Sequence, residues 1–242
     1  MAGSIDKLRF EVLVDNPCPK PLLAGIDEAG RGPVIGPMVI ACVSVPRDKG
    51  DEVNELLLNI GVKDSKLLSK KKREELFERL KQYLGSITVA YIAPEIIDEY
   101  ASKGRYNWLE AEVISRLLSL IPGIKIVYID APSNSKDFEK KIRSFLRGES
   151  GIELIVEKQA DKKYPIVSAA SIVAKVLRDK AIEEIKKEIE IDFGSGYPSD
   201  PKTREALPKI LKIRPEAVRK SWKTLRKVQQ TKLDDLIKHN KL

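Results

Sequence analysis

The 242-residue chain has few of the side chains on which much enzyme chemistry depends, with only two cysteines, Cys18 and Cys42, and one histidine, His239. Two cysteines are too few for a disulfide framework or a thiolate metal site, although a single bridge between them stays open. One histidine near the C-terminus argues against catalysis by a histidine base. Carboxylates, by contrast, are abundant, with 36 Asp and Glu residues.

Long apolar runs are also missing from the chain. No stretch approaches the ~20 apolar residues of a membrane-spanning helix. The first residues, MAGSIDKLRFEVLVDNP, lack the apolar centre of a signal peptide. The sequence therefore predicts a cytoplasmic protein without a membrane partner.

The net charge of +8 is unevenly distributed along the chain. Residues 201–242 carry 13 Lys and Arg against 4 Asp and Glu, a balance of +9, whereas the first 200 residues have a balance of −1. A near-neutral body with a basic end is typical of proteins that bind nucleic acid. A solvated, lysine-rich surface is an equally good interpretation of the charge alone.

Short β-branched runs alternate with longer amphipathic stretches, which predicts an α/β fold. We expect five strands: Leu22–Asp27, Pro37–Val45, Ser86–Ile92, Ile124–Asp130 and Ile152–Val156. We expect helices near Glu52–Asn59, Lys70–Leu84, Pro94–Ala101, Trp108–Leu120, Ser135–Leu146 and Ile166–Glu188. The glycine turn between the first two strands favours antiparallel pairing, and a helix before each of the last two favours parallel neighbours. The prediction is a mixed five-stranded sheet flanked by helices, followed by a C-terminal helical lobe.

Four acidic residues lie at the predicted strand ends or at a helix start: Asp27, Glu28, Asp130 and Asp161. A buried, unpaired carboxylate costs several kcal/mol, so a cation should meet them. Carboxylates without histidine or cysteine select hard cations such as Mg²⁺ or Mn²⁺. Two such ions about 4 Å apart can activate water and stabilise the leaving oxygen of a phosphodiester.

Asp27 and Glu28 raise a geometric difficulty, because adjacent strand residues point to opposite faces of a sheet. They can share a metal site if Glu28 already lies beyond the strand, where the following turn bends the backbone. That turn, Gly30-Arg31-Gly32, matches neither the dinucleotide-binding fingerprint nor the P-loop. Its glycines permit close approach of the backbone to a ligand, and a plain hairpin turn is the alternative.

Several segments together resemble the ribonuclease HII family, most of all its archaeal branch, which is related to the catalytic subunit of the eukaryotic enzyme. In chain order they are AGIDEAGRGPVIGPMV, KDSKLLS, VYIDAP, QADKKYP, SAASIVAKVLRD, GSGYPSDPKT and RKSWKT, between about Leu22 and Thr224. The resemblance implies a ribonuclease H-like fold and an endonuclease that cleaves RNA paired with DNA. It also implies incision on the 5′ side of a single ribonucleotide embedded in duplex DNA.

The resemblance further implies roles for individual residues. Four carboxylates match the family's metal ligands: Asp27, Glu28, Asp130 and Asp161. The turn that grips the ribonucleotide and its 2′-OH is matched by Gly30, Arg31 and Gly32. Tyr197 matches the tyrosine that senses the RNA–DNA junction. Three further residues fall in segments expected to line the phosphate path: Lys66, Lys175 and Thr203.

The same resemblance suggests how the chain is divided. We expect an N-terminal extension (1–21), a ribonuclease H-like catalytic domain (22–193), and a substrate-contacting loop with a basic C-terminal helical lobe (194–242). The tail segment Gln230–Ile237 resembles the sliding-clamp-binding box of replication proteins, and an ordinary amphipathic terminal helix is the alternative. Archaeal relatives suggest a monomer.

Two other functions stay open at this point. Another ribonuclease H-like nuclease, such as a junction resolvase, would use similar acids on all-DNA substrates. A non-catalytic nucleic-acid-binding module would show salt-sensitive binding without any cleavage product.

Overall fold

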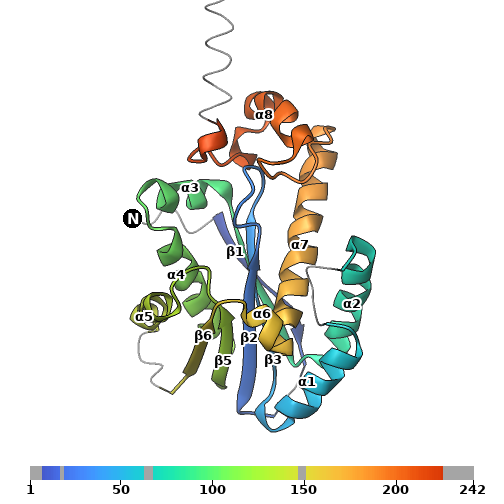
Figure 1. The fold of residues 1–242 in the computed structure, drawn as a ribbon, viewed down its shortest axis with the longest axis vertical. Helices are drawn as coiled ribbons and strands as arrows, with labels where there is room; N and C mark the ends of the chain where they lie inside the picture. The colour runs from blue at the N-terminus through green and yellow to red at the C-terminus, as the bar shows by residue number, and fades with distance from the viewer. Residues whose placement is uncertain (1–6, 17–18, 63–67, 147–150, 226–242) are drawn as a thin grey trace, which may run out of the picture.

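The structure, a computed structural model, describes residues 7–16, 19–62, 68–146 and 151–225. Its centre is a single mixed sheet with helices packed against both faces (Figure 1). Among the described residues, no helix has both the length and the apolar character needed to cross a membrane.

The sheet has six strands in the order β1-β4-β3-β2-β5-β6. Their bounds are β1 Leu8–Asp15, β2 Leu22–Ala29, β3 Met38–Pro46, β4 Ser86–Ile92, β5 Ile124–Asp130 and β6 Glu153–Glu157. The first four strands in sequence pair antiparallel, and β5 and β6 continue the sheet parallel to β2. The predicted fold class and the mixed pairing are confirmed.

The prediction of five strands is wrong by one. Residues 8–15, which we assigned to an extension, form the edge strand β1 and pair antiparallel with β4. The sequence LRFEVLVD mixes charged with apolar residues, and its side chains are only half-buried or exposed. An edge strand buries less of its surface than a central one, so it lacks the continuous apolar run that revealed the other strands. The division of the chain into domains is otherwise still a prediction.

Two helical layers cover the sheet (Figure 1). One layer contains α1 Gly50–Asn59, α2 Lys70–Tyr83, α6 Ala160–Lys163 and α7 Pro165–Ile189, and the other contains α3 Pro94–Ser102, α4 Tyr106–Ser119 and α5 Ser135–Phe145. Alternate residues of β2 and β3 enter the two separate apolar cores, as the period of a strand requires. The six predicted helices are confirmed, with ends that differ by one or two residues.

Local signals explain where several helices begin. The Ser69 hydroxyl accepts a hydrogen bond from the backbone N–H of Lys72 at the start of α2, and Asn134 caps α5 in the same way. Asp200 caps α8, Pro201–Ile213, whose first residue is a proline. Each cap satisfies a backbone donor that the first helical turn would otherwise leave unpaired.

Helix α7 lies unusually close to strand β2, at Gly25. A Cβ on Gly25 would stand 2.5 Å from the carbonyl oxygen of Ile166 and 2.8 Å from the backbone nitrogen of Val167. Only glycine permits this approach, and the buried alanines at 169, 170 and 174 give α7 a face of small side chains. The first turns of α7 are therefore held against the end of β2 that carries Asp27.

A third apolar core joins α8 and the C-terminal segment to the end of α7. Ile35 forms a β-bridge with Val218, which ties this segment to the loop between β2 and β3. In Figure 1, α8 and the residues after it lie beyond the β2–β3 turn, at the far end of α7. Cys42 is buried in β3 and is a free thiol, whereas Cys18 lies outside the described residues.

Candidate active site

Asp27 and Asp130 lie side by side because their strands are parallel neighbours. In the β2–β5 ladder Ile26 stands opposite Ile129, and the next residue of each strand is the aspartate. Ile26 and Ile129 both enter the apolar core under α4 and α5. The two aspartates therefore point to the opposite face, which α7 covers.

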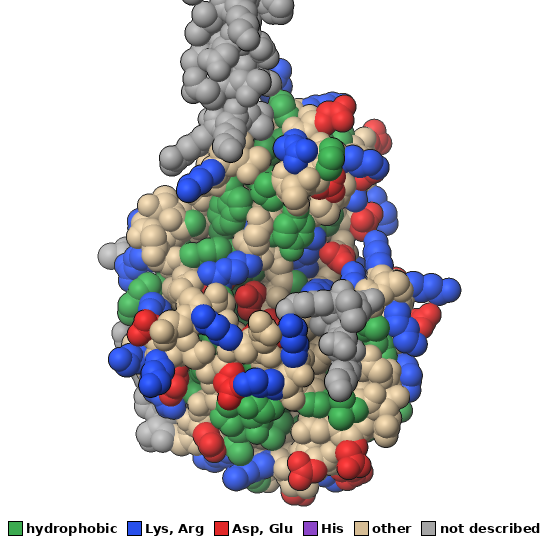
Figure 2. Space-filling model, in the orientation of Figure 1, with side chains coloured by type: hydrophobic (Ala, Val, Ile, Leu, Met, Phe, Trp, Pro, Cys, Tyr) green, Lys and Arg blue, Asp and Glu red, His purple; other side chains and the backbone are tan. Residues whose placement is uncertain are grey.

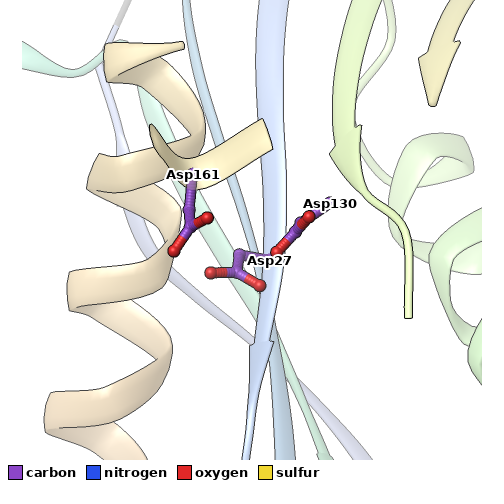
Figure 3. A group of neighbouring side chains, drawn as sticks. All are labelled: Asp27, Asp130 and Asp161. Carbon is purple, nitrogen blue, oxygen red and sulfur yellow. The ribbon is translucent and has the colours of Figure 1, made fainter. Parts of the chain in front are cut away.

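Asp161 reaches the same place from the short helix α6. Gln159 has a left-handed φ of 57°, which turns the chain after β6, and the N–H of Ala160 donates to Asp130 Oδ1 at 3.0 Å. The three carboxylates point toward one another in Figure 3, and one oxygen of each lies within 4.8 Å of the others. Asp27 and Asp161 are each only 6% exposed.

The electrostatics of this group are unfavourable without a cation. Burial raises the pKa of Asp27 to about 7, and repulsion from Asp130 and Asp161 adds to that shift. Hydrogen bonds from the Ser171 hydroxyl and from the N–H of Glu28 act in the opposite direction but do not restore the ordinary value. Carboxylates whose charged forms are disfavoured in this way gain most from a nearby positive ion.

The donor set fits a hard divalent cation. All three groups offer carboxylate oxygens and none offers nitrogen or sulfur, which selects ions of the Mg²⁺ and Mn²⁺ type. Two oxygens bound to one such ion lie at most about 4.2 Å apart, twice a metal–oxygen distance of ~2.1 Å. The carboxylate oxygens of the three aspartates lie within 4.8 Å of one another, so small side-chain rotations can bring them to this spacing.

Glu28 does not join this group, because it does not lie beyond the strand, which was the condition for sharing a metal ion with Asp27. Strand β2 continues to Ala29, and Glu28 pairs with Ile40 within the ladder, so its side chain points to the α4 face. Burial raises the pKa of Glu28 well above its ordinary value, and Glu110 and Asp27 add to this, while Arg31 lowers it. Asp27 and Glu28 thus present carboxylates on two sides of one strand end.

A cleft of about 370 Å³ opens at the end of β2, where Glu28 lines it. It is lined by Glu28, the Gly30–Gly32 turn, Lys175, Arg178 and Tyr197, among others. Figure 2 shows acidic side chains at the floor of a hollow that Lys and Arg side chains surround. This arrangement places anionic groups, which can hold cations, within a rim that attracts a polyanion.

The carbonyl groups of the glycine turn are held by side chains from distant parts of the chain. Arg219, fully buried, donates from Nη2 to Gly30 O at 2.5 Å and from Nη1 to Arg31 O at 2.9 Å. Trp222 Nε1 donates to Gly32 O at 3.0 Å. Burial lowers the pKa of Arg219 to about 10, so the guanidinium stays charged at neutral pH. Gly30 itself has a φ of +85°, which favours glycine.

The Arg31 side chain is tied to helix α4. Its Nη1 donates to the carboxylate of Glu110, at 2.5 Å for Oε1, and its Nη2 donates to Asn107 Oδ1 at 2.7 Å. Burial raises the pKa of Glu110 to about 7 although Arg31 opposes that shift. Asn107 also donates to Ser133 Oγ at 2.9 Å, which links the glycine turn to the loop that follows Asp130.

Tyr197 stands on a loop that is packed against the glycine turn. Gly196, with a φ of +80°, accepts a hydrogen bond from Val34 N at 2.8 Å through its carbonyl. A Cβ on Gly32 would stand 3.5 Å from the Tyr197 ring, so the ring lies directly over that glycine. Tyr197 is 38% exposed, and its ring is therefore presented to a ligand in the cleft.

The three residues predicted to line the phosphate path have different outcomes. Lys175 lines the cleft. Thr203 is fully buried; its hydroxyl accepts from Gly196 N at 3.0 Å and donates to Phe193 O at 2.8 Å. That prediction is therefore wrong for Thr203, which shapes the Tyr197 loop from below. Lys66 lies outside the described residues.

Comparisons with known proteins agree with this geometry. Solved structures with the same fold include the crystal structure of ribonuclease H2 from Pyrococcus horikoshii. It is 42% identical to this chain with a TM-score of 0.75, and the match covers 87% of this chain and 98% of that one. The PCNA:RNase HII complex from Archaeoglobus fulgidus has a TM-score of 0.71 and is 39% identical, covering 84% and 95%. The fold and the carboxylates thus define a nuclease of the ribonuclease H class.

The particular family follows from the sequence matches. The model of the family "Ribonuclease HII" matches residues 24–225. The ribonuclease HII of Pyrobaculum islandicum is 46% identical over 206 residues, which are 85% of this chain and 98% of that protein. This chain belongs to the ribonuclease HII family and is a metal-dependent endoribonuclease that acts on RNA–DNA hybrids.

Proposed function

We propose that the enzyme cuts the RNA strand of RNA–DNA hybrids and incises duplex DNA on the 5′ side of a single embedded ribonucleotide. The products are a 3′-hydroxyl and a 5′-phosphate. The observation that carries the proposal is the convergence of Asp27, Asp130 and Asp161 at the ends of two parallel strands and the start of a helix. Membership of the ribonuclease HII family supports it.

The proposed cofactors are two divalent cations, Mg²⁺ or Mn²⁺. Asp27, Asp130 and Asp161 would hold them on the α7 side, and Glu28 would contribute from the other side of the strand end. When bound, such ions activate water for attack and stabilise the charge on the leaving oxygen. No histidine base is required for this chemistry, which fits a chain whose single histidine is His239.

The glycine turn supplies the proposed recognition of the ribose. A 2′-hydroxyl is both donor and acceptor, and it distinguishes RNA from DNA on an otherwise similar backbone. Gly30 and Gly32 lack side chains that would keep a sugar away, and the bonds from Arg219 and Trp222 hold the turn in one conformation. A preformed turn loses little conformational entropy when the ribonucleotide binds.

Tyr197 and Lys175 complete the proposed substrate contacts. The exposed Tyr197 ring, placed over Gly32, would stack on the sugar next to the ribonucleotide and exclude a bulkier ribose there. This preference would select the RNA–DNA junction. Lys175 lines the same cleft and would bind a backbone phosphate.

One cleavage assay tests the function. A labelled duplex with one ribonucleotide is incubated with Mg²⁺, Mn²⁺ or a chelator, beside a continuous RNA–DNA hybrid and an all-DNA duplex of the same sequence. We expect cleavage of the single-ribonucleotide duplex and of the continuous hybrid, but not of the all-DNA duplex. Cleavage should require a divalent ion, and the cut should lie on the 5′ side of the ribonucleotide. Cleavage of the all-DNA duplex would indicate a different ribonuclease H-like nuclease. Salt-sensitive binding without product would indicate a non-catalytic module.

We also propose a sliding clamp as a partner, bound by the tail segment Gln230–Ile237. This segment lies outside the described residues, so the proposal rests on its sequence and on the relative from Archaeoglobus fulgidus, whose structure is that of a PCNA:RNase HII complex. Titration of the tail peptide with the cognate clamp should show binding, and a peptide with Leu236 and Ile237 replaced by alanine should not bind. A monomer in the cytoplasm is the form that we expect to carry out the reaction.

A further inference from the structure

Arg178, on helix α7, is a buried arginine between the two elements that recognise the substrate. It is 5% exposed, although it borders the cleft. A side chain with so little exposed surface has little room to meet a phosphate. Its contacts are instead with the protein, and they converge on Tyr197.

The guanidinium of Arg178 holds the Tyr197 loop in two ways. Its Nη2 donates to Ser195 O at 2.7 Å, two residues before the tyrosine. Its Cζ lies 5.3 Å from the centre of the Tyr197 ring, in the arrangement of a cation–π contact. The loop and the ring are thus held by one planar group.

Arg178 also touches the glycine turn. A Cβ on Gly30 would lie 3.1 Å from Arg178 Cγ, and a Cβ on Gly196 would lie 3.3 Å from its Nη2. The stem of the side chain therefore packs under the turn while the guanidinium packs under the tyrosine. A single side chain sets the spacing between the two elements.

A second arginine limits the movement of Arg178 from outside. Asp179 Oδ1 accepts from Arg178 Nη1 at 3.3 Å, and Asp179 Oδ2 accepts from Arg73 Nη2 at 3.3 Å. Arg73, on α2, also donates to Leu68 O at 2.6 Å. Asp179 therefore connects α2 with the arginine beneath Tyr197.

We propose that Arg178 is the positioning residue that orients Tyr197 over the glycine turn and thereby sets the preference for a single ribonucleotide over a continuous hybrid. The inference rests on the proposed role of Tyr197. Lysine keeps the positive charge but has neither the planar surface nor the fork of donors, so it cannot make the stacking contact and the bond to Ser195 O together.

The test is the ratio of kcat/KM on the single-ribonucleotide duplex to kcat/KM on the continuous hybrid. Tyr197→Ala should lower this ratio about tenfold or more, the effect of losing one stacked contact. Arg178→Lys should lower it about tenfold, because the loss on the single-ribonucleotide duplex is larger than the loss on the hybrid. Because Arg178 acts through Tyr197, the double variant should have the ratio of Tyr197→Ala alone.

Two further variants control for general loosening of the loop. Arg204→Lys alters an arginine that donates to Pro198 O and Ser199 O of the same loop but has no cation–π contact with Tyr197, and it should leave the ratio unchanged. Asp179→Asn should lower the ratio less than Arg178→Lys does, and it tests the proposal if Arg178→Lys does not fold.

Three results would overturn the proposal. The first is an equal loss of kcat/KM on both substrates in Arg178→Lys. The second is a double variant whose ratio falls by the product of the two single effects. The third is a ratio in Arg204→Lys as low as that in Arg178→Lys. Wild-type enzyme that cleaves neither substrate would instead refute the proposed function, so the two failures are distinguishable.

Discussion

The carboxylate group and the recognition side of the cleft are built in opposite ways. Regular elements place the three aspartates: two neighbouring strands carry Asp27 and Asp130, and a short helix carries Asp161. The pairing register of the two strands fixes the positions of the first two. The Gly30–Gly32 turn and the Tyr197 loop are irregular, and the buried residues Arg219 and Arg178 hold them. The chemistry therefore depends on secondary structure, whereas the specificity depends on a few long-range hydrogen bonds to loops.

Asp130→Asn should break the carboxylate side alone and have the largest effect on cleavage. The amide keeps an acceptor for the N–H of Ala160 but removes one negative charge from the metal group. We expect turnover to fall by about 100- to 1,000-fold, as when a preorganised electrostatic contact is lost. Gel assays give the turnover, and thermal unfolding and duplex binding serve as controls that should stay near wild type. Turnover within tenfold of wild type would contradict the assignment.

Arg219→Met should break the recognition side while leaving the carboxylates in place. The substitution leaves the carbonyls of Gly30, Arg31 and Gly36 without their buried donor. Each unsatisfied carbonyl costs about 1–3 kcal/mol of stability. Removal of a buried charge offsets part of this cost. We expect unfolding free energy to fall by about 3 kcal/mol in urea titrations. Arg116→Met, which removes only a surface pair with Glu112, should cost less than about 0.5 kcal/mol. Equal losses in the two variants would refute the anchoring role of Arg219.

Gly25→Ala should displace a regular element, helix α7, rather than a loop. The new Cβ would meet the Ile166 carbonyl at 2.5 Å and push α7 away from β2. We expect a loss of about 2 kcal/mol in stability. We also expect a marked loss of activity, since Asp161 lies in α6, which directly precedes α7. Gly50→Ala is the matched control, because its Cβ would meet nothing closer than 3.5 Å and its backbone is helical. An active Gly25→Ala enzyme would show that the spacing of α7 is not critical.

The pH dependence of stability tests the carboxylate side with no change of residue. The pKa of Asp27 is raised from about 4 to about 7, so the metal-free folded state holds a proton that the unfolded chain releases in this window. Metal-free stability should therefore fall on the order of 1–3 kcal/mol as pH rises from 5 to 8. Excess Mg²⁺ should restore more at pH 8 than at pH 5, because the ion competes with protons. Thermal unfolding with and without Mg²⁺ at each pH measures this stabilisation. Equal stabilisation by Mg²⁺ at pH 5 and at pH 8 would contradict the expected competition with protons.

Features that depend on contacts between residues close in the sequence could be predicted, and those that depend on distant residues could not. Asp27 and Asp130 each end an apolar run, so their place at strand ends was predictable, and the parallel register brings them together. The side of the strand on which Glu28 lies depends on one more ladder pair, with Ile40, which no local pattern predicts.

The anchors could not be predicted for a related reason. Arg219 contacts carbonyls almost 190 positions away, and its neighbours in RKSWKT give no sign of its partners. Thr203 was expected in the phosphate path because its segment belongs to a substrate loop, but its burial depends on how α8 packs. Long-range contacts of single side chains leave no periodicity in a sequence, whereas strands and helices do.

The most direct test of the account is a crystal structure of the protein soaked in Mn²⁺, with anomalous scattering recorded to locate the ion. We predict a manganese peak among Asp27, Asp130 and Asp161, at about 2.0–2.4 Å from an oxygen of each carboxylate. A fully occupied manganese site elsewhere, with none among these three residues at saturating Mn²⁺, would contradict it.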